Sequence, residues 1–212
     1  MAAESPYFFL SYARGHFDTG SHPHKWIVKF FRDLCADIAE LTGSPTPGYM
    51  DKQRLEIGTR WPFELTDALA TCKVLLPIFS PQYFTSDYCG KEWEIFSRRI
   101  TRHPWGDDPP KVIIPVHWTP MEIEDLPEMV RHVQHRQADL PQHYQREGLY
   151  GIMRLGKYRE AYKETVLHLA RAIVKAAGVE LTPLDESERV PPHQIPSAFT
   201  DVKAFKGGLD DR

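Results

Sequence analysis

Cysteine is scarce in this sequence, at 3 of 212 residues (Cys35, Cys72 and Cys89). Their odd number and wide separation argue against a disulfide framework. Long apolar runs are also missing, because no stretch approaches the roughly 20 residues that span a bilayer. The first residues lack the basic region and the apolar length of a signal peptide. We therefore expect a cytoplasmic protein with no membrane partner.

An excess of positive charge is absent as well. The chain has 26 Lys and Arg against 29 Asp and Glu, a net charge of -3, whereas nucleic-acid binding normally needs a clustered basic face. We expect no nucleic-acid partner. His16, His22 and His24 share one polar stretch but have no Cys or carboxylate at metal-site spacing, so no metal site is expected. Neither G-x-G-x-x-G nor a Walker loop occurs, which disfavours a Rossmann dehydrogenase and a P-loop NTPase.

Apolar strand-like segments alternate with helical patterns along the chain. The expected strands are 7–12, 48–51, 74–79, 112–118 and, less clearly, 132–136. Between and after them, apolar residues recur at helical spacing over 26–41, 61–69, 86–100 and 158–174. Such alternation is typical of a five-stranded parallel sheet with helices on both faces. Pro77 and Pro115 fall inside expected strands, where we place them at the end of the hydrogen-bonded ladder.

The chain divides by composition near Gly178. Residues 1–178 carry the periodic segments and are expected to form one domain. Residues 179–212 contain prolines, glycines and charges with little periodicity, which predicts a flexible C-terminal tail or linker.

The segment Ser80–Trp93 holds the strongest candidate for chemistry. It follows the strand 74–79 and opens a helix, and open α/β sheets place ligands at such junctions, outside the carboxyl ends of their strands. Glu92 lies one turn after Tyr88 and Cys89, at the border of the apolar stripe. The plain alternative is a solvated first-turn carboxylate, which the helix dipole favours.

These segments, in order, resemble the TIR (Toll/interleukin-1 receptor) domain family. The resemblance covers roughly residues 6–177 and is carried by four groups of residues. The first two are Phe9-Leu10-Ser11-Tyr12, and Asp51, Gly58, Trp61, Leu65, Ala68-Leu69 and Cys72. The other two are Ser80-Pro81-x-Tyr83 with Ser86 and Cys89-x-x-Glu92, and Val112–Val116. It implies a flavodoxin-like three-layer sandwich. The sequence of the first half is most similar to bacterial stand-alone TIR-like proteins of the FxsC type. The BB loop departs from the family, because Lys52–Gly58 replaces the common Arg-Asp-x-x-Pro-Gly.

The resemblance implies an enzyme that cleaves NAD+ between nicotinamide and ribose, with Glu92 as the catalytic glutamate. NAD+ would be the substrate, with no further cofactor, and linear and cyclic ADP-ribose are both open as products. Nicotinamide is a good leaving group, and the transition state resembles an oxocarbenium ion. One nearby carboxylate can stabilise that positive charge. The resemblance also implies activation by TIR–TIR self-association, in bacterial signalling or defence.

Six further residues are expected to line the NAD+ pocket: Tyr12, Arg14, Leu55, Trp61, Ser86 and Cys89. Four of them have a structural alternative. Arg14 pairs with a phosphate or stays on the surface, and Ser86 contacts the ligand or caps its helix. Cys89 packs as a small apolar residue rather than acting as a nucleophile, and Trp61 closes over the ligand or belongs to the core.

Two other functions compete with NAD+ cleavage. A non-catalytic TIR scaffold, acting through homotypic contacts alone, stays open because the BB loop is altered. A flavodoxin-like receiver domain is disfavoured, because the first strand is not followed by the paired acidic residues that hold Mg²⁺ at a phosphoacceptor site.

Overall fold

A computed structural model of the chain describes residues 5–13, 22–45, 47–51, 63–102, 105, 109–131, 133, 140–190 and 194–199. In chain order its elements are β1 (Phe8–Tyr12), α1 (His22–Thr42), β2 (Gly48–Met50), α2 (Phe63–Thr71), β3 (Val74–Phe79), α3 (Pro81–Thr85), α4 (Asp87–Thr101), β4 (Val116–His117), η1 (Ile123–Asp125), α5 (Glu128–Arg131), α6 (Gln142–Arg154), η2 (Gly156–Tyr158), α7 (Arg159–Ala176) and η3 (Glu186–Glu188). None of the described helices has the length and apolar character needed to cross a membrane.

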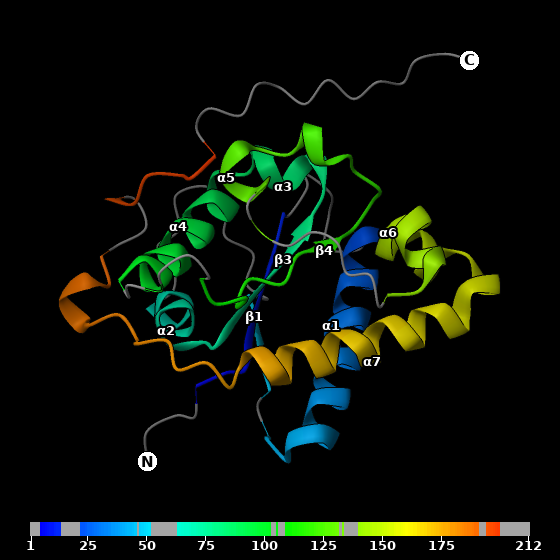
Figure 1. The fold of residues 1–212 in the computed structure, drawn as a ribbon, viewed down its shortest axis with the longest axis horizontal. Coiled ribbons are helices and arrows are strands. Elements are labelled where there is room, and N and C mark those ends of the chain that lie inside the picture. The colour runs from blue at the N-terminus through cyan, green and yellow to red at the C-terminus, as the bar shows by residue number, and fades with distance from the viewer. Residues whose placement is uncertain are drawn as a thin grey trace.

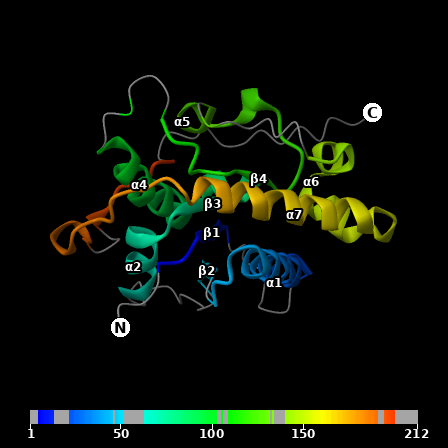
Figure 2. The ribbon, with the colours of Figure 1, turned by 60° about the horizontal axis from the view of Figure 1, so that its bottom comes forward.

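The described strands form a parallel sheet in the order β2-β1-β3-β4, with helices on both faces. In Figure 1, α2 and α4 lie on one side of the sheet and α1, α6 and α7 on the other. Helix α7 crosses α1 in Figure 1, and the two helices lie next to each other in Figure 2, in contact. The predicted three-layer α/β fold is thus confirmed.

Side chains of β1 alternate between two separate halves of the core. Phe8, Leu10 and Tyr12 belong to the apolar cluster formed with α1 and α7. Phe9 belongs to the second cluster, on the side of α2 and α4. Because successive strand residues point to opposite faces, Ser11 shares the face of Phe9. It is a fully buried polar residue in an otherwise apolar and aromatic strand.

The fourth strand is much shorter than the sequence predicts, and Pro77 of β3 explains why. The Leu75 N–H points toward the β4 side and donates to the Val112 carbonyl at 2.9 Å. Alternation puts the nitrogen of residue 77 on the same side, where proline has no N–H to donate. Pairing is accordingly reduced to an isolated bridge at Ile113 and the two residues of β4.

The outer edge of β4 meets helix α6. The His117 N–H donates to the Tyr144 hydroxyl at 2.9 Å, so a side chain takes the position that a neighbouring strand would use. The predicted fifth strand spans residues 132–136. Within this range the structure describes only Val133, and it also describes Arg131 just before it. That strand therefore lies almost wholly outside the described residues.

Much of the C-terminal segment packs against the domain, contrary to the prediction of a flexible tail from residue 179. Leu181, Leu184, Ile195 and Phe199 are buried in the cluster with α2 and α4. In Figure 1 this segment, orange to red, passes along the outer side of those helices. The prediction failed for 179–190 and 194–199 because their apolar residues follow no helical or strand period, although four of them are buried.

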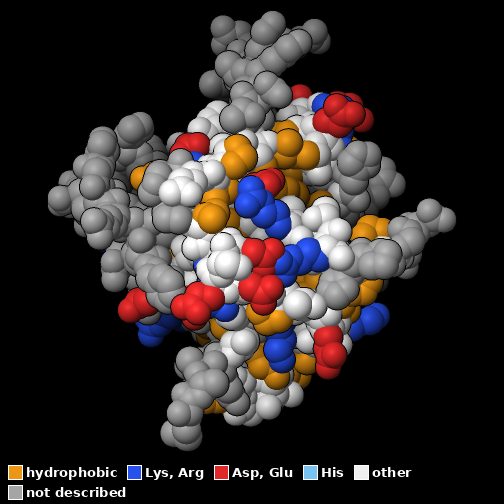
Figure 3. All heavy atoms as spheres, turned by 90° about the vertical axis from the view of Figure 1, so that its left-hand side faces the viewer, with side chains coloured by type: hydrophobic (Ala, Val, Ile, Leu, Met, Phe, Trp, Pro, Cys, Tyr) orange, Lys and Arg blue, Asp and Glu red, His pale blue; other side chains and the backbone are white. Residues whose placement is uncertain are grey.

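Ion pairs fasten the same segment from outside. Arg189 pairs with Asp67 of α2, and Arg102, at the end of α4, pairs with Glu188 of η3. Figure 3 shows acidic and basic side chains next to one another at the centre of this face. The segment is therefore held by charge at its surface as well as by apolar burial beneath.

Candidate active site

The junction between β3 and α4 is shaped by two capping serines. The Ser80 hydroxyl accepts a hydrogen bond from the Tyr83 N–H at 3.2 Å and caps α3, with Pro81 in its first turn. The Ser86 hydroxyl accepts from the Cys89 N–H at 3.3 Å and caps α4. Serine is favoured at such positions because its oxygen satisfies an N–H that the helix leaves unpaired. The two caps turn the chain so that α4 packs against the sheet.

Glu92 points from α4 into the protein rather than into solvent. Only 8% of the residue is exposed. The Ser11 hydroxyl, on the facing strand β1, donates to the Glu92 Oε2 atom at 2.5 Å. That length is at the short end of the range for an O–H donor bonded to a carboxylate. The carboxylate is thus fixed at the carboxyl end of the first strand.

Tyr83 extends this contact into a chain of three side chains. Its hydroxyl lies 3.0 Å from the Ser11 hydroxyl. A serine has one hydroxyl hydrogen, and the hydrogen of Ser11 goes to Glu92, so Tyr83 donates to Ser11. Burial above all, with the nearby Cys89 and Glu92, raises the pKa of Tyr83 well above its ordinary value, which keeps this donor protonated. Linked donors of this kind strengthen one another in a low-dielectric interior.

When ionised, the Glu92 carboxylate places a negative charge in a fixed position at the sheet's carboxyl edge. A buried carboxylate acts on a nearby positive charge more strongly than an exposed one, because less water screens it. It needs no reorganisation when charge develops beside it. Chemically, the site is suited to stabilising a cation and to accepting hydrogen bonds from hydroxyl groups.

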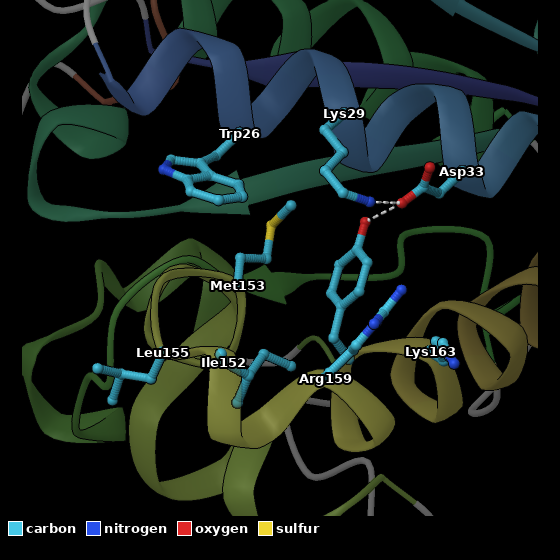
Figure 4. A pocket seen from close by; sticks show the side chains of 10 residues that line it. Trp26, Lys29, Asp33, Ile152, Met153, Leu155, Arg159 and Lys163 are labelled. Carbon is cyan, nitrogen blue, oxygen red and sulfur yellow. Dashed lines mark hydrogen bonds and ion pairs between the residues drawn. The ribbon is translucent and has the colours of Figure 1, made fainter.

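Two hollows lie elsewhere among the described residues. One, of about 340 Å³, lies between α1, α6 and α7, on the opposite face of the sheet from Glu92. Figure 4 shows Trp26 and Met153 on its apolar side and the ion pair of Lys29 with Asp33 on its polar side. The other, of about 140 Å³, is lined by Ser86 and Phe199 at the α3–α4 junction. Of the predicted site residues that the structure describes, Ser86 alone lines either hollow.

Comparison with known proteins decides the family. The family model of the TIR domain matches residues 8–150. The chain belongs to the TIR domain family. The matched region includes β1, the α3–α4 junction and Glu92. Among curated proteins, none matches the chain. The FxsC subtype stays a prediction.

A likeness to a solved structure also exists for this TIR domain. It is to the TIR domains in the structure of the activated Roq1 resistosome directly recognizing the pathogen effector XopQ. The identity is 17%, the alignment covers 82% of this chain and 84% of that chain, and the TM-score is 0.38. A likeness of this size does not bear on chemistry.

The structure places the predicted pocket residues of the TIR domain in different surroundings. Ser86 and Cys89 share α4 with Glu92, Ser86 as its N-cap and Cys89 as a buried residue. Tyr12 lies beside Ser11 in the chain, but its side chain is on the α1 face, with its hydroxyl 3.4 Å from the Asp51 carbonyl oxygen. Contact of these three residues with NAD+ stays a prediction. Arg14, Leu55 and Trp61 lie outside the described residues.

Ser11 and Tyr83 are the functional candidates that sequence reasoning missed. Both occur in the segments that resemble TIR boxes, but neither was assigned a role. The available signal was the position of Ser11 as the lone small polar residue in Phe8–Tyr12, a strand expected to be buried on both faces. A buried hydroxyl needs a hydrogen-bond partner, and Glu92 is that partner.

Ser11→Ala tests whether the contact matters to the fold. We expect the variant to lower the free energy of unfolding by about 1–3 kcal/mol, because the buried Glu92 loses a donor. Tyr83→Phe keeps the ring and removes only the outer hydroxyl, so a smaller loss is expected. Urea unfolding followed by fluorescence measures both. A Ser11→Ala midpoint equal to that of the wild type would show that the hydrogen bond contributes nothing.

Proposed function

We propose that this TIR domain cleaves NAD+ between nicotinamide and ribose, with Glu92 as the catalytic carboxylate. The observation that supports it is the buried Glu92 side chain, bonded to Ser11 at the carboxyl end of β1. In open α/β sheets that edge is where ligands bind. NAD+ is proposed as the substrate because of the TIR family, and the Glu92 carboxylate is suited to the cleavage of NAD+.

The reaction breaks the bond between the ribose C1′ atom and the nicotinamide nitrogen. The bonding electrons go to the positively charged ring, which leaves as neutral nicotinamide, and positive charge builds on the ribose. The Glu92 carboxylate stabilises that charge and accepts hydrogen bonds from ribose hydroxyls. Attack of water at C1′ gives ADP-ribose and a proton, and attack by an adenine nitrogen gives a cyclic product. Both products belong to the proposal.

Assembly belongs to the proposal as well. In the described residues, neither hollow includes Glu92, and we propose that neighbouring TIR copies complete the NAD+ site. The activity would serve cytoplasmic signalling or defence in a bacterial cell. A scaffold without chemistry is the alternative outcome of the experiments below.

The dependence of rate on concentration tests this proposal. We expect nicotinamide release per protomer to rise steeply with protein concentration, because assembly completes the site. Purified full-length protein is incubated with NAD+ over a wide range of protein concentrations, and nicotinamide is quantified by chromatography. Size-exclusion chromatography of the same samples reports assembly. A rate per protomer that stays constant across the range would contradict activation by assembly.

A further inference from the structure

We infer that the C-terminal segment 194–199 holds Glu92 in place, and that Phe199 is a positioning residue for this carboxylate. The segment follows the matched family region by more than forty residues in the chain. It nevertheless packs against the first turns of helix α4, which carries Glu92.

Phe199 inserts its ring among the aromatic residues of that junction. Its ring centroid lies 5.5 Å from that of Phe84, 5.6 Å from that of Tyr83 and 6.1 Å from that of Trp93. Only 7% of Phe199 is exposed. Tilted and edge-on aromatic contacts at these distances are favourable beyond simple burial. One side chain from the C-terminus therefore contacts both α3 and α4.

The backbone of the segment also contacts α4 directly. The Ala198 N–H donates to the Gly90 carbonyl oxygen at 3.2 Å. A Cβ atom at position 90 would overlap the Ser197 hydroxyl and lie 3.2 Å from the Ala198 nitrogen. Glycine inside a helix is unfavourable, and this close approach gives Gly90 a structural reason. Residue 90 lies two positions before Glu92.

These contacts connect Phe199 to the Glu92 carboxylate by a short path. The Phe199 ring packs on Tyr83, whose hydroxyl bonds to Ser11, whose hydroxyl bonds to Glu92. Trp93, the residue after Glu92, contacts the same ring. The segment thus supports the carboxylate through its hydrogen-bond donor and through its own helix. Loss of the Phe199 ring should loosen both supports together.

The test compares Phe199→Ala, Phe199→Leu and Phe31→Ala in the full-length chain. Phe31 is a matched control, because it is 8% exposed and packs against Phe8 on the opposite face of the sheet. Hydrogen exchange followed by mass spectrometry reports the amides of residues 83–93. We expect Phe199→Ala to raise their exchange rates about tenfold or more, and Phe31→Ala to leave them unchanged.

Enzyme kinetics provide a second test, and this test rests on the proposed function. At a concentration where the wild type cleaves NAD+, we expect Phe199→Ala to lower kcat about 10- to 100-fold with KM nearly unchanged, since misplacement of a catalytic group costs rate. Phe199→Leu, which restores apolar volume, should recover part of the loss.

Equal exchange over 83–93 in wild type and Phe199→Ala would overturn the inference, as would an equal rise in Phe31→Ala. If the wild type cleaves no NAD+, the proposed function fails, and the exchange arm still decides the role of Phe199.

Discussion

Glu92→Gln is expected to lower kcat for NAD+ cleavage by about 100-fold or more, the usual cost of removing one stabilising group from a transition state. Glutamine keeps the size of the side chain, and its amide oxygen can still accept the Ser11 hydroxyl. The negative charge is lost, and one acceptor oxygen becomes an NH2 donor. The expected fall in rate therefore reports charge stabilisation of the ribose cation rather than a change in shape.

Glu94→Gln is the matched control on the same helix. Glu94 is partly exposed and pairs with Arg98 at 2.9 Å, facing away from the Ser11 contact. We expect its kcat to stay within about twofold of the wild type, because a screened surface charge contributes little. Thermal unfolding of both variants checks that they are folded. Equal losses in Glu92→Gln and Glu94→Gln would remove Glu92 from the catalytic role.

Arg99→Met is expected to lower the free energy of unfolding by about 3–5 kcal/mol, because several buried carbonyl groups lose a hydrogen-bond donor at a cost of roughly 1–3 kcal/mol each. Arg99 is 1% exposed, on α4. Its guanidinium donates to four backbone carbonyls, those of Leu69, Cys72, Leu181 and Thr182. Methionine fills the space left by the stem but donates to none of these oxygens, so the buried carbonyls of Leu69, Cys72 and Leu181 would each lose a donor.

The position of Arg99 explains why so large an effect is expected. The side chain joins the end of α2 and the C-terminal segment to α4, so its loss removes the hydrogen bonds that it makes to both. Burial lowers the pKa of Arg99 and raises that of the adjacent Cys72 thiol to about 12. The thiol therefore stays protonated at neutral pH and gives the guanidinium no ion pair, which leaves the four carbonyls as its main partners.

Arg98→Met provides the control for that prediction. Arg98 is the preceding residue but pairs with Glu94 at the surface, so a loss of about 0.5 kcal/mol or less is expected. Urea unfolding measures both variants. For a chain of this size, the Arg99→Met loss corresponds to a fall in Tm of roughly 10 °C. Coincident unfolding curves for the two variants would show that the buried contacts of Arg99 do not hold the segment.

The sequence predicted the fold and the location of the candidate site because both depend on local patterns. Apolar runs and helical periods placed the strands and helices, and capping, one of the two roles considered for Ser86, is observed at the start of α4. Glu92 was placed at the border of the buried face, and it lies there. The shortening of β4 could not be predicted from the sequence, because it depends on how Pro77 of β3 is aligned with the neighbouring strand.

Contacts between distant segments could not be predicted in the same way. Ser11 and Glu92 are 81 residues apart, and only the packing of α4 on β1 brings them together. Phe199 lies further still, in a segment whose apolar residues have no period. Low periodicity predicts flexibility only when a chain buries little, and this segment buries four large apolar side chains.

Catalysis of NAD+ cleavage by Glu92 is tested most directly by the release of nicotinamide from NAD+ by wild type and Glu92→Gln, measured side by side at the highest protein concentration at which both assemble. We expect nicotinamide and an ADP-ribose product in equal amounts from the wild type, and at least about 100-fold less of both from Glu92→Gln. Equal release by both proteins, or none from assembled wild type, would contradict this role of Glu92.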